Sequence, residues 1–153
     1  VHGDPKISNL LFVEGRATAW VDLDTLGRLD LPTELGDAFR SWCNPEGEDG
    51  DAQRFDPALF EAALVAYADA VEGLLHPDEQ AALVAGVLSV CVELSARFLA
   101  DALNESYFGW NPERYPTRGA HNLHRGLGQL RLARSVAAQR AEAEAVTRRV
   151  FSR

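Results

Sequence analysis

Two short apolar segments near the start of the chain have the pattern of a β-hairpin. Residues 9–13 and residues 18–23 are rich in aliphatic, β-branched and aromatic side chains, and Gly15 lies in the connection between them. Short runs of this kind around a glycine-containing turn are typical of antiparallel strands. We therefore expect the first 24 residues to form a loop, a strand, a turn, a second strand and a loop.

The rest of the chain has apolar positions at helical spacing. Pro32 opens a segment that runs to about residue 43, and Asp56 with Pro57 opens a second, whose apolar stripe reaches residue 75. Pro77 opens a third helix, apolar over most of its circumference, that extends to about residue 103. A last helix is expected from about His121 to the C-terminus. The pattern predicts a mainly α fold with one small β-hairpin.

Two connections between these helices differ in composition. Residues 44–54 are rich in Gly, Asp and Glu, and we expect them to form an exposed, mobile loop. Residues 104–119 contain several aromatic residues and prolines. That composition suits an ordered loop or the wall of a ligand site.

Composition limits the class of protein. At 153 residues, with 46% hydrophobic and 25% charged residues, the chain has the character of one globular domain. It has no uninterrupted apolar run of about 18 residues and no signal-peptide pattern at Val1, so we expect no membrane contact. Cys43 and Cys91 lack metal-ligand spacing and are expected to be buried free thiols of a cytoplasmic protein. A net charge of −8 disfavours nucleic-acid binding.

His2, Asp4 and Asn9 stand in the order H-x-D-x-x-x-x-N just before the first predicted strand. Phosphoryl-transfer enzymes of the kinase type use this spacing. The aspartate accepts the proton of the attacking hydroxyl, and the asparagine holds a metal ion. Lys6 is the single lysine among fifteen basic residues, and its compact ammonium can neutralise charge on the phosphoryl group. Asp4 and Lys6 are therefore candidate catalytic residues.

A second acidic motif ends the predicted hairpin. Asp22 and Asp24 lie where the second strand ends, and the hairpin brings that end back towards Asn9. Carboxylate and amide oxygens suit Mg²⁺, so we expect Asn9 and Asp22 to hold this metal, with Asp24 as a further ligand. An Asp followed five residues later by an Asn is frequent by chance. The two motifs at hairpin separation are much more specific than either alone.

Together the motifs resemble those of the aminoglycoside phosphotransferase and choline kinase superfamily, which has a protein-kinase-like fold. The catalytic loop and metal-binding segment of this family match Asp4, Asn9 and Asp22 position by position. The resemblance implies that Asp4 is the catalytic base, that Asn9 and Asp22 bind Mg²⁺ and so the nucleotide ATP, and that Asp37 braces the catalytic loop. Later segments are similar to the N-acetylhexosamine 1-kinase-like group, which implies transfer of the γ-phosphate of ATP to a sugar hydroxyl.

The resemblance covers almost the whole chain and implies the C-terminal lobe of such a kinase. Residues 1–30 would hold the catalytic loop and the metal-binding hairpin, and residues 31–153 a helical subdomain. The N-terminal lobe of the family grips ATP with a phosphate-covering loop and a lysine, and no such Gly-rich loop occurs in the sequence. We therefore expect an incomplete fragment with little or no kinase activity of its own. An exposed apolar surface where the other lobe would pack would favour self-association.

Residues of the third helix and of the segment after it could contact a sugar, because sugar rings stack on aromatic faces and hydroxyls need polar partners. The candidates are Arg97, Asp101, Tyr107, Phe108 and His121. Several have plainer structural explanations: Arg97 as a helix-surface pair with Glu93, Phe108 in the core and His121 at a helix start. His2 is expected to brace the catalytic loop as a hydrogen-bond donor.

Two other functions stay open at this stage. A kinase for an aminoglycoside, choline or another amino alcohol would need a denser acidic or aromatic cage, to which residues 46–51 could contribute carboxylates. A non-catalytic helical binding module would keep the fold without the chemistry. The intact Asp4, Asn9 and Asp22 argue against that second alternative.

Overall fold

The computed structural model describes residues 1–71 and 73–152 of the chain. Within them, five α-helices and one two-stranded antiparallel sheet make up the fold, which confirms a mainly α architecture with a small hairpin. Two short 3₁₀ turns flank the hairpin. In chain order the elements are η1 (Ile7–Asn9), β1 (Leu10–Val13), β2 (Arg16–Trp20), η2 (Leu23–Thr25), α1 (Leu31–Trp42), α2 (Pro57–Ala70), α3 (Pro77–Asn104), α4 (Arg118–Ala138) and α5 (Arg140–Phe151).

Side-chain caps explain where four of these helices begin. The carboxylates of Asp30 and Asp56 accept backbone N–H groups in the first turns of α1 and α2. At the start of α3, the ring of His76 accepts a backbone N–H, and Glu79 accepts the N–H of His76 at 2.8 Å. Thr117 caps α4 in the same way. The caps satisfy N–H groups that have no partner inside their helix.

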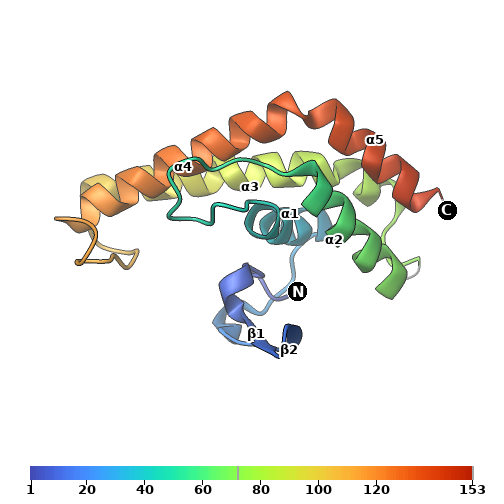
Figure 1. Cartoon of the computed structure of the whole chain (residues 1–153), viewed down its shortest axis with the longest axis horizontal. Helices are drawn as coiled ribbons and strands as arrows, with labels where there is room; N and C mark the ends of the chain where they lie inside the picture. The colour runs from blue at the N-terminus through green and yellow to red at the C-terminus, as the bar shows by residue number, and fades with distance from the viewer. Residues whose placement is uncertain (72, 153) are drawn as a thin grey trace.

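The core of the molecule lies around α3, which contacts α1, α4 and α5 (Figure 1). Phe39 of α1 and Phe60 of α2 meet edge to face in this core, with ring centroids 5.1 Å apart. Cys43 and Cys91 are buried there as free thiols, as expected. Burial raises the pKa of both thiols to about 12.

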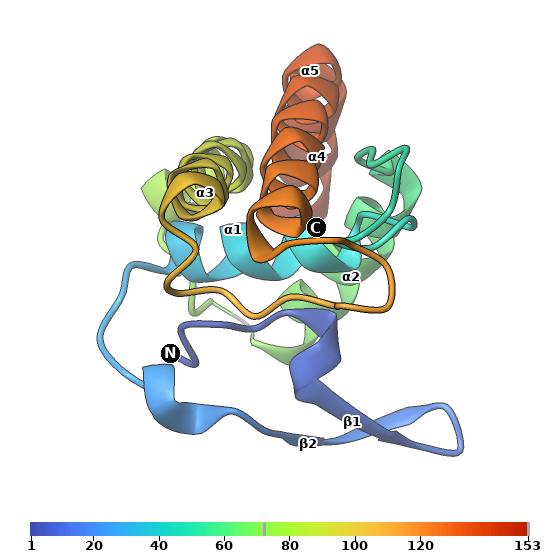
Figure 2. The same ribbon diagram turned by 90° about the vertical axis from the view of Figure 1, so that its left-hand side faces the viewer.

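Two glycines bring α1 and α3 together backbone to backbone. A Cβ atom on Gly36 would lie 2.6 Å from the carbonyl carbon of Gly86, and a Cβ atom on Gly86 would overlap the carbonyl oxygen of Pro32. Only glycine fits such an approach. Figure 2 shows the result: α1 runs between the helical layer of α3 and α4 and the N-terminal hairpin. One side of α1 is therefore held by the core while the other faces the first 30 residues.

The hairpin pairs earlier in the chain than the sequence predicts. β2 begins at Arg16 rather than at residue 18 and ends at Trp20 rather than at residue 23. Glu14 and Gly15 both have positive φ, which gives a tight two-residue turn and lets pairing start with Val13 opposite Arg16. The strand cannot continue as far as predicted because Asp22 adopts the left-handed conformation.

The helical segment that follows residue 56 is shorter than predicted. α2 ends at Ala70 rather than reaching residue 75, and Gly73 has a φ of +72° a short distance beyond this end. The predicted last helix is two helices, α4 and α5, separated at Gln139. The side-chain amide of Gln139 donates to the carbonyl of Phe55, which ties the break to the start of α2.

Residues 44–54 are held against the helices at several points, so the prediction of an exposed loop is correct for only part of the segment. The buried guanidinium of Arg40 lies 3.4 Å from Glu48, and Arg125 of α4 donates to Asp49 at 2.8 Å. Asn44 and Gln53 are themselves buried. The composition of the segment indicates polarity, but it does not reveal that arginines of other helices lie opposite these carboxylates.

α3 is long and apolar enough to cross a membrane, judged by length and composition alone. The core helix of a soluble protein passes the same test. In this structure α3 packs against three other helices, and Glu93 and Arg97 form an exposed pair, 3.6 Å apart, near its end.

Candidate active site

The first nine residues form a loop whose backbone is fixed from two sides. The carboxylate of Glu34 accepts the N–H of His2 at 2.8 Å and the N–H of Gly3 at 3.0 Å. Gly3 has a φ of +85°, and a Cβ atom there would overlap the carbonyl oxygen of Thr25. From that side the hydroxyl of Thr25 donates to the carbonyl of His2 at 2.9 Å. The loop is thus clamped between α1 and the residues after the hairpin.

The ring of His2 braces the same loop, as expected from the sequence. Its Nδ1 accepts the N–H of Asp4 at 3.3 Å, so Nε2 carries the proton and donates to the carbonyl of Val21 at 3.0 Å. The ring is buried and lies 4.9 Å from the ring of Trp20. Since both ring nitrogens are used inside the protein, His2 supports the loop rather than acting on a ligand.

Two further side chains of α1 hold the second half of the loop. The indole N–H of Trp42 donates to the carbonyl of Pro5 at 2.8 Å, and the hydroxyl of Ser41 accepts the N–H of Ile7 at 2.9 Å. Trp20 of β2 stacks on Trp42 with ring centroids 6.3 Å apart. α1 therefore positions the loop at both of its ends.

This bracing brings Asp4, Lys6 and Asn9 together. The ammonium of Lys6 lies 2.5 Å from Oδ2 of Asp4. The side-chain amide of Asn9 donates to the same oxygen at 3.1 Å and to the main-chain carbonyl of Asp4 at 2.9 Å. Among the described residues, Oδ1 of Asp4 has no hydrogen-bond partner. The side chains of Asp4 and Lys6 are 26% and 34% exposed, so a ligand can reach them.

The hairpin places Asp22 beside the loop. The N–H of Val21 donates to the carbonyl of Asn9 at 3.0 Å, and Asp22 follows directly. Asp22 has a φ of 65°, a conformation that residues other than glycine seldom adopt, and it is exposed. Because the amide nitrogen of Asn9 is bound to Asp4, its oxygen Oδ1 is the atom left for a ligand. Asn9 is buried and Asp22 is exposed, and the backbone hydrogen bond of Val21 brings the two residues next to each other.

The available ligands suit a magnesium ion that keeps water or phosphate oxygens around it. In residues 1–71 and 73–152, no three His, Cys, Asp or Glu side chains gather as a metal centre. Asp24, in η2, is exposed and close to Asp22 in the chain. Mg²⁺ is normally bound by one or two carboxylates together with waters and substrate phosphates. The residues fit this arrangement, and they do not fit a closed zinc site.

The expectation that Asp37 braces the catalytic loop is wrong. Asp37 pairs with the buried Arg40, with nitrogen and oxygen 2.6 Å apart, and Glu34 takes the bracing role. Sequence reasoning missed Glu34, Ser41 and Trp42. The available signal was that Glu34 and Ser41, seven residues apart, share one face of α1. The helical period shows that they share a face but not what that face contacts.

Four of the residues expected to contact an acceptor line one hollow of about 390 Å³ at the end of α3. They are Arg97, Asp101, Tyr107 and Phe108. The guanidinium carbon of Arg97 lies 5.7 Å from the ring centroid of Tyr107 and 5.4 Å from that of Phe108. Phe108 also packs on Phe98, with centroids 4.4 Å apart. The hollow thus combines a cation with aromatic faces.

Asp101 is used to hold the wall of this hollow. Its carboxylate accepts the backbone N–H groups of Ser106, Tyr107 and Phe108 and the side-chain amide of Asn122, at 2.8–2.9 Å. Burial acts to raise the pKa of Asp101, but the backbone donors outweigh it, so the pKa lies below its ordinary value. Both oxygens of Asp101 therefore have structural partners. The other polar side chains that line the hollow are Arg97, which pairs with Glu93, and those of Asn104, Ser106 and Tyr107.

The hollow lies apart from the catalytic loop. No hydrogen bond or ion pair joins residues 97–119 to residues 1–30 in the described parts of the chain, and Figure 1 shows them at different positions along α3. His121 belongs to neither place: it is buried, its Nε2 donates to Asp49 at 2.9 Å, and its ring stacks on Tyr115. The structure thus gathers Asp4, Lys6, Asn9 and Asp22 in one site and Arg97 and Tyr107 in another.

A scan against models of protein families found no match to the chain. A search of curated proteins found none either. Its function is therefore inferred from the chemistry of its own residues.

Proposed function

We propose that the chain is the C-terminal lobe of an ATP- and Mg²⁺-dependent phosphotransferase, similar to the aminoglycoside phosphotransferase and choline kinase superfamily. One observation carries the proposal: Asp4, Lys6 and Asn9 are in mutual contact on a braced loop, and the hairpin brings Asp22 beside Asn9. A carboxylate and a cation are then close to two further residues, Asn9 and Asp22, whose side chains carry oxygens. Phosphoryl transfer needs such parts, because its catalysis consists mainly of positioning and charge stabilisation.

In the proposed reaction, Asp4 accepts the proton of the acceptor hydroxyl while the hydroxyl oxygen attacks the γ-phosphorus of ATP. The new oxygen–phosphorus bond forms, the bond to the bridging oxygen breaks, and ADP leaves. Asn9 and Asp22, with Asp24 close by, would hold Mg²⁺, which when bound neutralises phosphate charge. The flexible stem of Lys6 lets its ammonium turn from Asp4 to the transferring phosphoryl group.

We propose a sugar as the acceptor, as in the N-acetylhexosamine 1-kinase-like group. A cationic acceptor such as an aminoglycoside or choline would need unpaired carboxylates. Most of the acidic segment that could supply them is engaged: Glu46 pairs with Arg54, Glu48 with Arg40, and Asp49 with Arg125, while Asp51 stays exposed. This pairing favours a neutral acceptor. The aromatic and cationic character of the hollow at Arg97 and Tyr107 supports the same choice.

The exposed apolar face of the hairpin supports a second lobe in the complete enzyme. Phe12 and Val13 of β1 are 51% and 60% exposed. Other large apolar side chains exposed around them are Ile7, Leu11, Leu23, Leu26 and Leu29. Large exposed apolar side chains that gather in one part of a chain are typical of an interaction site. We propose that the nucleotide-gripping lobe packs against these side chains, and that copies of the isolated chain associate through them.

Phosphate transfer in the protein at its natural length tests the proposed activity. Labelled ATP is offered with N-acetylhexosamines, an aminoglycoside and choline. We expect Mg²⁺-dependent transfer to an N-acetylhexosamine, reduced by about 10²- to 10⁴-fold in Asp4→Asn because the general base is lost. Asp69→Asn removes an exposed carboxylate of α2 and should leave the rate unchanged. Transfer that survives in Asp4→Asn would refute the assigned mechanism.

The metal site can be tested on the 153-residue chain itself, without activity. Mn²⁺ stands in for Mg²⁺ and broadens the NMR signals of nearby amides. We expect broadening around residues 9 and 21–25, lost in Asp22→Asn and Asn9→Ala and kept in Asp69→Asn. Broadening centred on residues 46–51 would contradict the site. If neither a metal site nor transfer is found, the chain is a non-catalytic binding module.

A further inference from the structure

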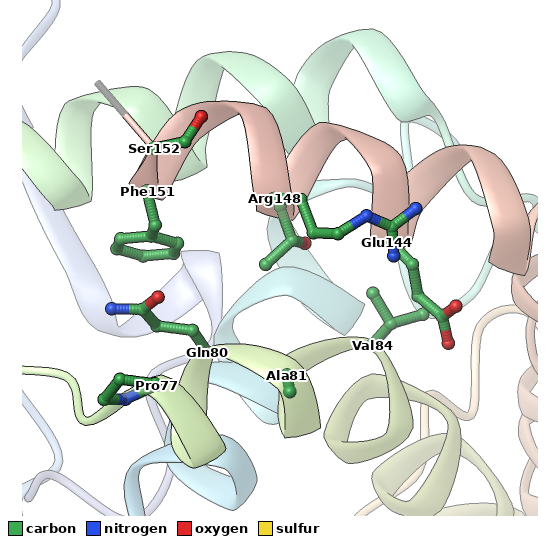
Figure 3. Close-up of a pocket in the computed structure, with 9 residues that line it drawn as sticks. Pro77, Gln80, Ala81, Val84, Glu144, Arg148, Phe151 and Ser152 are labelled. Atoms are coloured by element: carbon green, nitrogen blue, oxygen red, sulfur yellow. The ribbon is translucent and has the colours of Figure 1, made fainter.

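A second hollow, of about 550 Å³, lies between the first turns of α3 and the last turns of α5 (Figure 3). None of its lining residues belongs to the catalytic loop or to the hairpin. Its volume is within the range of small-molecule sites, which is about 300–1,000 Å³. Nothing in the proposed phosphoryl transfer uses it.

One end of this hollow is formed by Phe151 of α5 and Pro77 of α3, with the amide of Gln80 between them. Ala81 and Val84 of α3 continue its apolar floor towards Glu144. Figure 3 shows the ring of Phe151 facing α3 near Pro77. The nearby hydroxyl of Thr147 already donates to a carbonyl of its own helix, so it adds no unsatisfied polar group. The amide nitrogen of Gln80 likewise donates to the carbonyl of Leu75 at 3.0 Å, so an apolar chain or ring can lie here without breaking either hydrogen bond.

The other end carries one uncompensated positive charge. Glu144 pairs with Arg140, with nitrogen and oxygen 2.6 Å apart. Arg148 makes no ion pair within the described residues, and Figure 3 shows it extended along α5 on the side of Glu144, away from Phe151. The hollow thus has an aromatic ring at one end and a guanidinium at the other.

We propose that this hollow binds a small anionic amphiphile, in which a carboxylate is attached to an apolar chain or ring. The carboxylate pairs with the guanidinium of Arg148, whose planar fork matches carboxylate geometry. The apolar body lies between Phe151 and the first turns of α3. This inference does not depend on the proposed phosphotransferase activity.

Titration with decanoate, below the concentration at which it forms micelles, tests the proposal. Amide NMR of the labelled chain locates the site. We expect saturable shifts in residues 77–84 and 144–152. Arg148→Gln should weaken binding by about fivefold, the effect of losing one exposed ion pair. Ala81→Phe should weaken it at least tenfold by filling the hollow, and because Ala81 is exposed the new ring does not strain the core.

Two matched controls distinguish binding at this site from non-specific electrostatic or hydrophobic binding. Arg134→Gln removes an equally exposed arginine of α4 and should leave decanoate affinity unchanged. Decylamine has the same chain with the opposite charge and should bind more weakly than decanoate. The proposal is overturned if the shifts fall on the hairpin instead, if Arg148→Gln binds as tightly as the native chain, or if decylamine binds as well as decanoate.

Discussion

Replacing Glu34 by Gln tests what holds the catalytic loop in place. The carboxylate accepts two backbone N–H groups, from His2 at 2.8 Å and from Gly3 at 3.0 Å. A hydrogen bond to a charged group contributes about 1.5–3 kcal/mol and one between neutral groups about 1 kcal/mol. Gln keeps one neutral acceptor and turns its NH₂ group towards the second donor. We therefore expect the attached loop to lose about 2–5 kcal/mol of stability relative to a detached one.

Hydrogen exchange followed by NMR measures this loss at the two amides concerned. The N–H groups of His2 and Gly3 exchange when the loop leaves Glu34. Since about 1.4 kcal/mol corresponds to tenfold, both should exchange roughly 30-fold faster, or more, in Glu34→Gln. Asp37→Asn is the matched control on the same helix. It weakens the pair with Arg40 and lowers global stability, but it leaves these two amides bonded to Glu34.

The opposite result would refute the assignment of the brace. If Asp37→Asn released the amides of His2 and Gly3 while Glu34→Gln left them protected, Asp37 would be the residue that holds the loop. If the amides of His2 and Gly3 were equally protected in the native chain, in Glu34→Gln and in Asp37→Asn, then Thr25 and the ring of His2 would suffice to fix the backbone of the loop.

Three further outcomes are expected. Gly86→Ala should lower the urea midpoint of unfolding, because the new Cβ meets the backbone carbonyl of Pro32 and overpacking typically costs about 1–3 kcal/mol. This cost opposes the gain of about 1 kcal/mol that Ala brings to a helix. Ser89→Ala, on the same helix, has no such contact and should not show the loss. Asp30→Ala should cost about 1 kcal/mol at neutral pH by removing the cap of α1. Hydrogen bonds from Thr33 lower the pKa of Asp30 in the folded chain below its ordinary value of 3.8. The stability that the Asp30 carboxylate contributes is therefore fully present above pH 3.8 and is lost as the pH falls through the lower, folded-state pKa. In acid below that pKa, Asp30→Ala and the native chain should have the same free energy of unfolding. Phe12→Asp should reduce self-association of the chain in analytical ultracentrifugation, whereas Leu103→Asp, on the exposed end of α3, should not; equal association in both would mean that another surface is responsible.

Local signals in the sequence were sufficient to place most helices. Asp30, Asp56 and Pro77 mark the starts of α1, α2 and α3 because caps and first-turn prolines act within a few residues of the helix they open. The apolar periodicity of α3 likewise indicates its central position. The break at Gln139 is not visible in this way, because it depends on a hydrogen bond to Phe55, which is 84 positions earlier in the chain.

For the candidate site too, the residues that local sequence patterns mark could be predicted, and those that act through long-range contacts could not. Asp4, Asn9 and Asp22 could be identified because their spacing is local and the hairpin that joins them has its own pattern. The bracing residues could not, since Glu34, Ser41 and Trp42 act across more than thirty residues. The roles of Asp101 and of residues 44–54 were missed for a related reason. A carboxylate in a sequence carries no sign of whether its partner is a ligand or the protein itself.

The close contact of α1 and α3 at Gly36 and Gly86 makes the position of the loop formed by residues 1–9 depend on the packing of the core. Gly36 lies where α1 contacts α3 backbone to backbone. Along the axis of α1, Glu34 lies about 3 Å before Gly36 and Ser41 lies about 7.5 Å after it. If α1 tilts about this contact, Glu34 and Ser41, which both hold the loop, move in opposite directions. A change in helix packing far from the loop would therefore twist the loop and change the orientation of Asp4 relative to Asn9, rather than shift the whole loop as a unit.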